Sequence, residues 1–346
     1  MSYRVNNNTA GNSGLTRRAF MGRAAGLTLA SSGTAGLLAG CGSSTGTGGQ
    51  GSNYPSETLH WTVAFGPGGG NDIMSRTIAD ILRNENLYPE DIVVTNREGG
   101  SGAKGWGYLY SHQGNPYHIS TTSGSFITTP LQADTPWGPT SFTPIALLAA
   151  DYLLFLVPPD GPKTYQEFVS RAKSKKPAIG GIGTVNVDFI VNAQLADEAG
   201  YAFDYVPFNA EGQLTTALLS GSLDAMVSNP AEVLGQVESG NMRALAFTGS
   251  QPISSLPDVP TLAKLGYSSI DIGMPRGLIL APDAPKTAQQ WWIRTMKEVV
   301  KKPAWQDYIT KNHLVEKLRW GQAFEDYVGK TSDTFERILR EQGAIQ

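Results

Sequence analysis

Five polar loops in this 346-residue chain have the composition of anion-binding sites. They contain glycine, serine, asparagine and threonine, and each follows a short apolar run. Helices are expected to begin closely after three of them, so free backbone N–H groups and the positive end of a helix dipole would face an anion. Glycine also lets the backbone approach a ligand, because it has no Cβ. The five loops are residues 66–72, 123–125, 183–186, 209 and 228–229.

The first of these loops differs from the known nucleotide-binding patterns. Gly66-Pro67-Gly68-Gly69-Gly70-Asn71 approaches Gly-x-Gly-x-x-Gly but ends in asparagine, and no acid follows at the end of a second strand. No loop continues into Gly-Lys-Ser/Thr, which excludes a P-loop. Taken alone, each loop is equally explained as a tight strand-to-helix turn. Because several loops fall at the same kind of sheet edge, we favour a shared binding site.

The usual catalytic combinations are missing from the sequence. Outside the Gly/Ser-rich residues 41–56 there is no Gly-x-Ser-x-Gly turn for a nucleophilic serine. The four histidines, at positions 60, 112, 118 and 313, are too scattered along the chain to indicate a metal cluster. Adjacent acids such as Asp197 and Glu198 fall on an expected helix face and are interpreted as solvated. We therefore expect a protein that is not an enzyme and holds no cofactor and no metal.

Alternating strands and helices must position the loops. Leu59, Trp61 and Val63 alternate with polar residues, which predicts a strand, and the helical spacing of Met74, Ile78, Ile81 and Leu82 follows it. The scheme repeats to about residue 247, with Thr164 as a helix N-cap and Pro230 in the first turn of a helix. This pattern predicts an α/β fold of mainly parallel sheets with helices on both faces. Ligands of such sheets bind outside the carboxyl ends of the strands.

The N-terminal region has the layout of a targeting segment. Residues 1–40 carry four arginines and no acid, and the apolar run before Leu38-Ala39-Gly40-Cys41 is too short and too polar to span a bilayer stably. Thr16-Arg17-Arg18-Ala19-Phe20-Met21 resembles a twin-arginine export signal, and the sequence around Cys41 resembles a bacterial lipobox. We expect residues 1–40 to be a signal peptide and Cys41, the only cysteine, to be lipidated. The Gly/Ser-rich residues 41–56 then form a flexible linker to the membrane.

Cleavage at this point would make the protein more acidic. The whole chain has 27 basic and 30 acidic residues, and removing the four arginines before Cys41 leaves 23 against 30, a net charge of −7. Such a surface does not suit nucleic acid or anionic lipid as a partner. An anion must therefore be bound by local loop geometry. About 300 remaining residues are enough for two domains.

Several motifs together resemble one receptor family. They are Val63 to Asp72, Val93 to Gly102, Tyr205-Val206-Pro207-Phe208, Leu219 to Met226, Gly240 to Ala246 and Leu256 to Thr261. In order and spacing they are similar to the substrate-binding receptors of tripartite tricarboxylate transporters, also called Bug or TctC proteins. The similarity covers nearly all of residues 57–346.

The resemblance implies a two-domain, Venus-flytrap periplasmic receptor for a small organic acid, which passes its ligand to membrane permease subunits. Domain I would comprise residues 57–152 and 275–346 and domain II residues 153–274, with crossover strands near 150–154 and 274–278. The C-terminal residues from about Lys286 are expected to be amphipathic helices that return to domain I. A monomer is expected. Carried over by position, the binding residues are Phe65, Gly66, Gly68, Gly69, Gly70, Asn71, Asp72, Ser123, Ser125, Gly183, Thr184, Asn186, Asp188, Asn209 and Asn229.

The chain departs from the family pattern at Asn71, at residues 184–188 and at residues 209–212. Asp188 would oppose a second carboxylate on the ligand or pair with an amine. Two other functions stay open at this point. One is an extracytoplasmic enzyme on the same fold, which twin-arginine export of folded proteins mildly favours. The other is a ligand sensor that docks a signalling partner.

Overall fold

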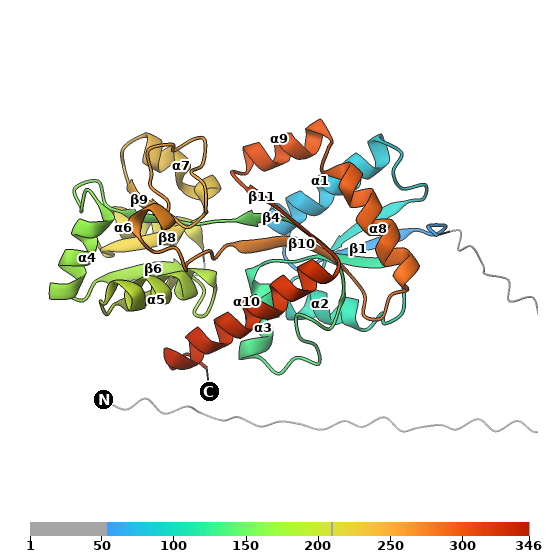
Figure 1. Cartoon of the computed structure of the whole chain (residues 1–346), viewed down its shortest axis with the longest axis horizontal. Helices are drawn as coiled ribbons and strands as arrows, with labels where there is room; N and C mark the ends of the chain where they lie inside the picture. The colour runs from blue at the N-terminus through green and yellow to red at the C-terminus, as the bar shows by residue number, and fades with distance from the viewer. Residues whose placement is uncertain (1–53, 209, 346) are drawn as a thin grey trace, which may run out of the picture. The chain divides into compact units, whose positions relative to one another are not determined.

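A computed structural model describes residues 54–208 and 210–345, which form two lobes, each built on one sheet (Figure 1). Cys41 and the expected signal peptide lie outside the described residues. The first sheet has the order β11-β4-β10-β3-β1-β2 and the second the order β7-β6-β8-β5-β9. The strands of the first lobe are β1 (Leu59–Val63), β2 (Ile92–Asn96), β3 (His118–Thr121), β4 (Thr143–Asp151), β10 (Met274–Leu280) and β11 (Val315–Trp320). Those of the second lobe are β5 (Leu154–Val157), β6 (Ala178–Ile182), β7 (Asp204–Phe208), β8 (Ala225–Ser228) and β9 (Arg243–Phe247).

The alternation of strands and helices confirms the expected α/β class, but both sheets are mixed and not mainly parallel: among the described strands, four pairings are parallel and five are antiparallel. In the first sheet β1, β2, β3 and β4 run one way, and β10 and β11 run against them. In the second sheet only β5 opposes the other four strands. Two of the three opposing strands lie directly after a crossing between the lobes: β5 is the first strand of the second lobe, and β10 is the first strand after the chain returns to the first lobe. The loops that follow β1, β3, β6, β7 and β8 therefore meet where the two sheets face each other.

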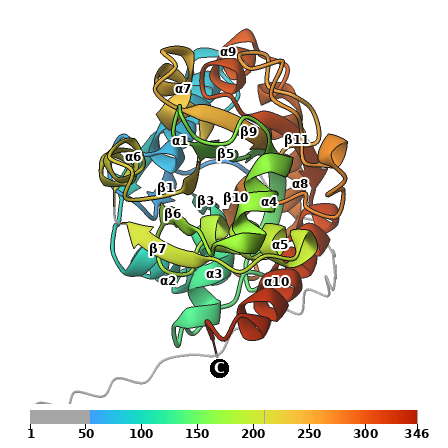
Figure 2. The same cartoon turned by 90° about the vertical axis from the view of Figure 1, so that its left-hand side faces the viewer.

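Helices cover both faces of the second sheet. Along β5, Leu154 and Leu156 belong to one apolar cluster, whereas Phe155 and Val157 belong to another on the opposite face. This alternation is that of a strand buried on both sides. Figure 2 shows α4 and α5 on one side and α6 and α7 on the other. These helices are α4 (Tyr165–Ser174), α5 (Val187–Ala199), α6 (Glu211–Leu219) and α7 (Pro230–Glu238). Thr164 accepts the Glu167 N–H as the N-cap of α4, and Pro230 opens α7, as predicted.

The first sheet is also covered on both faces. Trp61 packs with Ile78 and Trp292 on one face, and Trp106 and Phe126 lie under the other. Burying each such side chain contributes about 2–3 kcal/mol, so this core fixes the strands that carry the loops. The helices of this lobe are α1 (Gly70–Asn84), α2 (Ala103–Tyr110), α3 (Gly124–Gln132), α8 (Lys286–Val299), α9 (Pro303–Lys311) and α10 (Gln322–Glu341). None of the helices in the described ranges is long and apolar enough to cross a membrane.

The expectation that the C-terminal region is helical needs one correction. Helices α8, α9 and α10 are present, but Val315–Trp320 forms the edge strand β11 beside β4. Its charged residues Glu316, Lys317 and Arg319 alternate only loosely with apolar ones. Such charges are common on edge strands, where they prevent pairing with another chain. The local pattern therefore did not separate this strand from the amphipathic helices around it.

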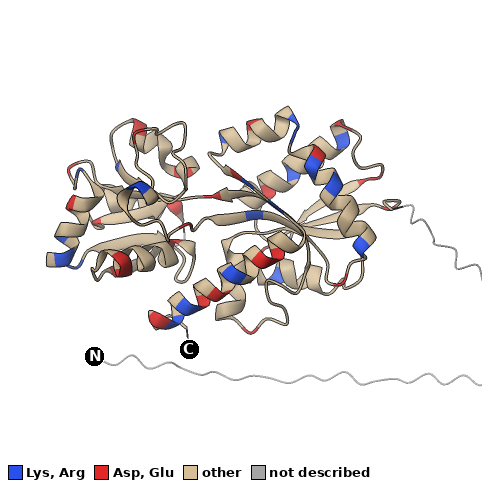
Figure 3. Ribbon diagram, viewed as in Figure 1, with Lys and Arg blue, Asp and Glu red and all other residues tan. Residues whose placement is uncertain are grey.

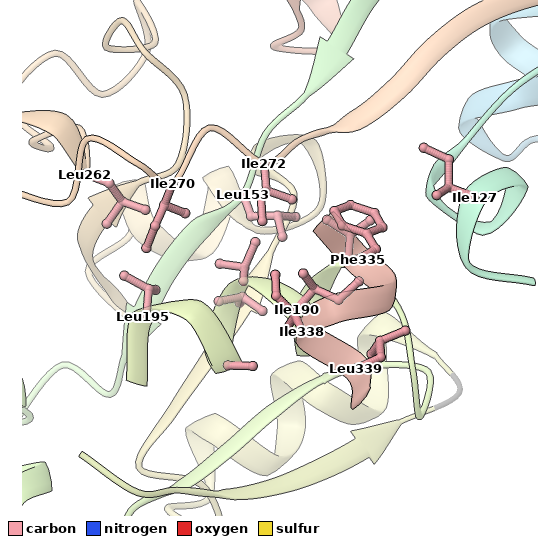
Figure 4. Close-up of a cluster of buried hydrophobic side chains, with 14 of the residues drawn as sticks. Ile127, Leu153, Ile190, Leu195, Leu262, Ile270, Ile272, Phe335, Ile338 and Leu339 are labelled. Atoms are coloured by element: carbon pink, nitrogen blue, oxygen red, sulfur yellow. The ribbon is translucent and has the colours of Figure 1, made fainter. Parts of the chain in front are cut away.

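The 20-residue helix α10 contacts both lobes. It packs on β4 and α3 of the first lobe and on α5 of the second. Near its C-terminal end, Phe335, Ile338 and Leu339 are buried in a cluster with Ile190 of α5 (Figure 4). A helix of this length spans about 30 Å, which is enough to reach across two lobes.

The chain crosses between the lobes twice, and the two crossings lie side by side. Tyr152 and Leu153 connect β4 to β5, and residues 248–273 lead from β9 back to β10. Met274 pairs with Asp151 in register, and Leu153 and Thr248 exchange hydrogen bonds. A polar triad also ties the crossings to β11: Lys317 donates to the Tyr152 hydroxyl and to Asp271, both at 2.9 Å, and Tyr152 donates to Asp271.

Candidate functional site

A cavity of about 340 Å³ lies between the lobes. This volume is at the lower end of the usual range for small-molecule sites. Nine of the predicted residues line it: Phe65, Gly69, Gly70, Asn71, Ser123, Ser125, Asn186, Asp188 and Asn229. Seven further lining residues were not predicted: Gly124, Ile182, Ala210, Glu211, Glu232, Met274 and Arg276.

Five helices begin at this cavity. The first residues of α1 and α3 come from the first lobe, and those of α5, α6 and α7 come from the second. N–H groups in the first turn of a helix have no partner within the helix, so each helix start offers donors and a partial positive charge. In α1, α5, α6 and α7 an acidic side chain already occupies the first turn. Helix α3 has none, which leaves its N-terminus the most attractive of the five to an anion.

Five of the other six predicted residues are described by the structure, and these five do not line the cavity. Gly66 and Gly68 shape the first loop, and Gly68 has a φ of 82°, a conformation that suits glycine. Gly183 is likewise at a φ of 75°, and Thr184 is exposed on the surface. Asn209 lies outside the described residues. Asp72 is 4 % exposed and points into the loop instead.

Asp72 fixes the first loop. It accepts hydrogen bonds from the Gly68 N–H, from Arg76 Nε and from Asn96 Nδ2, each at 2.9 Å. Burial alone would raise the pKa of Asp72, but the hydrogen bonds from Arg76, Gly68 and Asn96 outweigh it and hold the pKa below its ordinary value. Asp72 is therefore a structural residue, which positions Gly69 to Asn71 at the cavity.

Arg276 is the basic residue at the cavity that sequence reasoning missed. Its Nη2 is 2.5 Å from Asp151 Oδ2, and its Nη1 donates to Asn71 Oδ1 at 3.2 Å. Asn229 completes the group by donating to Asp151 Oδ1 at 2.6 Å. Arg276 therefore adds a guanidinium to the polar loops that the sequence predicts at this site. A signal was available, because an arginine inside the apolar run of the expected crossover strand is costly to bury without a partner.

Asp188, in contrast, has no cationic partner among the residues that the structure describes. Its Oδ2 accepts the Ile182 N–H at 2.7 Å, while its Oδ1 is buried without a hydrogen-bond partner. Burial raises the pKa of Asp188 to about 7, and the charges of Glu211 and Asp151 act in the same direction. Burial also raises the pKa of Glu211, which accepts from the Ser228 hydroxyl at 2.5 Å and lies near the charge of Glu232.

Three further polar groups at the cavity are buried without a hydrogen-bond partner in residues 54–208 and 210–345. They are Asn71 Nδ2, Ser123 Oγ and Arg276 Nε. All three belong to the first lobe, and all three can donate a hydrogen bond. Buried polar groups in proteins are nearly always satisfied, so groups of this kind at a cavity indicate where a ligand binds.

Comparisons with known proteins identify the family of this chain. The family described as "Tripartite tricarboxylate transporter family receptor" matches residues 74–344. The chain belongs to this receptor family. Among curated proteins the receptor is similar to Protein BugT of Bordetella pertussis, with 29 % identity over 66 % of this chain and 72 % of that protein. Membership makes the chain a solute-binding receptor of the kind that is exported.

Solved structures show the same fold. A TctC solute-binding protein from Polaromonas superposes on the receptor with a TM-score of 0.74 and 26 % identity, covering 83 % of this chain and 99 % of that one. MatC from Rhodopseudomonas palustris, solved with bound malate, gives a TM-score of 0.67 at 20 % identity, covering 83 % of this chain and all of that one.

The two lobes of the receptor touch beside the cavity. Gln132 of α3 donates to the Val185 carbonyl of the second lobe at 2.8 Å. A Cβ on Gly124 would lie 2.5 Å from Cγ2 of Val187, so only glycine allows α3 to approach α5 this closely. These contacts hold the two walls of the cavity together.

Histidines that are far apart in the sequence meet in the receptor. His118 stacks on His112, with ring centroids 3.8 Å apart, and on His60 at 4.9 Å. Burial and the neighbouring positive charges lower the pKa of His118 to about 4, which keeps it neutral at physiological pH. Within residues 54–208 and 210–345, no group of three or more His, Cys, Asp or Glu side chains is arranged to hold a metal ion.

Proposed function

We propose that this receptor closes on a small organic carboxylate in the cavity between its lobes and delivers it to the membrane subunits of a tripartite transporter. The observation that carries the proposal is the start of α3. Its N-terminus has no acid in the first turn, and Ser123, Asn71 and Arg276 present unpartnered donors beside it. A carboxylate there would accept hydrogen bonds from buried groups and would face the positive end of a helix dipole. The malate bound to MatC is a ligand of this class.

The two lobes would act as domains that move about the paired crossings at residues 152–153 and 248–273. A ligand that contacts both lobes stabilises the closed arrangement by its differential affinity for it. Asn71 and Ser123 on one side, with Asn186 and Asn229 on the other, are proposed to make these contacts. The protein is proposed to act as a monomer without catalysis.

A thermal-shift screen of monocarboxylates, dicarboxylates and tricarboxylates tests the proposal. A ligand at 100 times its Kd stabilises the folded state by about 2.7 kcal/mol, which raises the melting temperature measurably. We expect at least one carboxylate class to do so, and Ser123→Ala to reduce its effect. If sugars or amines without a carboxylate raise the melting temperature while no carboxylate does, the proposed ligand class is wrong.

The receptor is further proposed to leave the cell through twin-arginine export and to be anchored through lipidated Cys41. The sequence motifs at Arg17-Arg18 and Leu38 to Cys41 support this proposal. Lipoprotein acyl chains together give stable anchoring, which one chain alone does not. Labelling cells with palmitate should mark the wild type and leave Cys41→Ser unlabelled. Equal labelling of both would exclude the anchor, and export of an Arg17→Lys/Arg18→Lys variant at the wild-type level would exclude the twin-arginine route.

A further inference from the structure

The two walls of the cavity differ in charge. The second lobe contributes three acidic residues, Asp188, Glu211 and Glu232, and no basic residue to the lining. The first lobe contributes Arg276, whose charge is balanced by Asp151 at 2.5 Å. Figure 3 shows red acidic segments where the second lobe faces the first. The second-lobe wall is thus negative, while the first-lobe wall is neutral and rich in donors.

Asp188 is the most informative residue of this wall. An acid in the first turn of α5 interacts favourably with the helix dipole, and its bond to the Ile182 N–H connects the helix start to the last residue of β6. Those roles need only one carboxylate oxygen. Oδ1 is buried without a partner in a side chain that is only 2 % exposed. When Asp188 is ionised, as it is at pH 8, this oxygen can accept a hydrogen bond from a ligand and repels a second carboxylate.

The donors that would hold a ligand carboxylate are on the opposite wall. Asn71 Nδ2, Ser123 Oγ and Arg276 Nε all belong to the first lobe. A ligand carboxylate bound by them would direct the rest of the molecule towards Asp188 and Glu211. A second carboxylate at that end would be buried against like charges, which costs several kcal/mol per unpaired ion.

We propose that the ligand is an aminocarboxylate, whose carboxylate binds the first-lobe donors and whose protonated amine binds Asp188 with Glu211 and Glu232. This inference rests on the proposed function, because it assumes that a carboxylate occupies the first-lobe wall. An ammonium group supplies three donors, which suits several carboxylate oxygens at once. Its positive charge also compensates the uncompensated acids of the second lobe.

Matched ligand series provide the test. Calorimetric titrations of the full chain at pH 8 would compare, at each carbon number, a linear monocarboxylate, the α,ω-dicarboxylate and the terminal aminocarboxylate, and α-amino acids with their 2-hydroxy analogues. We expect an aminocarboxylate to bind at least about tenfold more tightly than the corresponding dicarboxylate or hydroxy acid. A dicarboxylate or hydroxy acid that binds as tightly as its amino partner would overturn the inference and leave the proposed function standing. Failure of every carboxylate to bind would refute both.

Substitutions of the acidic residues in the second-lobe wall test whether the ligand's amine binds there. Asp188→Asn retains an oxygen that can accept the Ile182 N–H, so it should fold, and it should lower aminocarboxylate affinity by about tenfold. Asp197→Asn, the same change at an exposed position of α5, is the matched control and should leave affinity unchanged. Glu232→Gln should weaken the same ligands, whereas Glu238→Gln at the other end of α7 should not. Wild-type aminocarboxylate affinity in both Asp188→Asn and Glu232→Gln would contradict the assignment.

Discussion

Asp72 and Asp188 occupy equivalent positions in the two lobes but have opposite surroundings. Each lies in the first turn of a helix that follows a strand ending at the cavity. Asp72 accepts the N–H of Gly68 in the loop before its helix, and Asp188 accepts the N–H of Ile182, the last residue of β6. Asp72 has Arg76 and Asn96 as further partners, so its pKa is lowered. Asp188 has none, and burial raises its pKa to about 7.

This difference separates a structural acid from one available to a ligand. The same local motif occurs in both lobes, but only Asp72 is fully satisfied by the protein. The comparison extends to the whole cavity, where the first-lobe wall offers donors and the second-lobe wall offers acids. Electrostatic environment therefore indicates the role of each residue better than its position in the motif.

The largest expected effect is on the pH dependence of stability through Asp188. Its carboxyl pKa is about 7 in the folded protein and about 3.9 in the unfolded chain, so the folded state keeps a proton that the unfolded chain loses as the pH rises. Stability should therefore fall between about pH 4 and pH 7, by up to about 4 kcal/mol. Asp188→Asn should lack this loss and be more stable than wild type at pH 8. Urea unfolding at pH 5 and pH 8 measures the difference, and parallel pH profiles for both proteins would contradict it.

Asp72→Ala tests the structural member of the pair. Removing three hydrogen bonds to a buried carboxylate should lower the free energy of unfolding by about 2–3 kcal/mol at pH 7. Because the pKa of Asp72 is lowered on folding, this stabilisation exists above about pH 4 and disappears as the pH falls further. Asp80→Ala on the same helix, where an exposed acid pairs with Arg83, is the control and should cost no more than about 0.5 kcal/mol. An equal loss in the free energy of unfolding for Asp72→Ala and Asp80→Ala would contradict the structural role of Asp72.

Gly124→Ala tests the contact between the two walls. The added Cβ would lie 2.5 Å from Val187, so the lobes must separate locally. We expect ligand affinity to fall by about tenfold, with little change in the stability of the unliganded protein. Gly107→Ala in α2 adds the same methyl group with its nearest atom 3.8 Å away and should bind normally. Unchanged affinity in Gly124→Ala would show that this approach is not needed for binding.

The smallest expected effect is that of Ser123→Ala on the donor wall. Ser123 Oγ has no hydrogen-bond partner in the described part of the chain, so its loss should leave the free energy of unfolding unchanged within about 0.5 kcal/mol. Loss of one hydrogen bond to a ligand carboxylate should weaken binding by about fivefold, or about 1 kcal/mol. Paired denaturation and calorimetry measure both quantities. A clear loss of stability without a loss of affinity would make Ser123 structural, like Asp72.

The sequence predicted the parts of the fold that depend on local pattern. Apolar periodicity located α1 and β1, and turn residues located the loops at Gly69 and Ser123. It missed β11, because a charged edge strand between helices has no clear period. At the site it missed Arg276 and Glu211, whose role depends on partners distant in sequence, Asp151 and Ser228. The sequence also could not predict that Asp72 and Asp188 differ in pKa and in role. This difference arises from burial and from the hydrogen bond between Asp72 and Asn96, which is 24 residues away in the chain.

Helix α10 adds a third mechanical connection between the lobes. Two strands alone would permit wide bending, whereas a helix that is packed on both bodies moves mainly by small sliding steps between side chains. Phe335, Ile338 and Leu339 pack in one cluster with Ile190 of α5, so we expect opening of the cavity to shift α5 along α10. We therefore expect the second lobe to move over only a small distance when the cavity opens. The rotamers available to these three apolar side chains near the C-terminus would limit that movement.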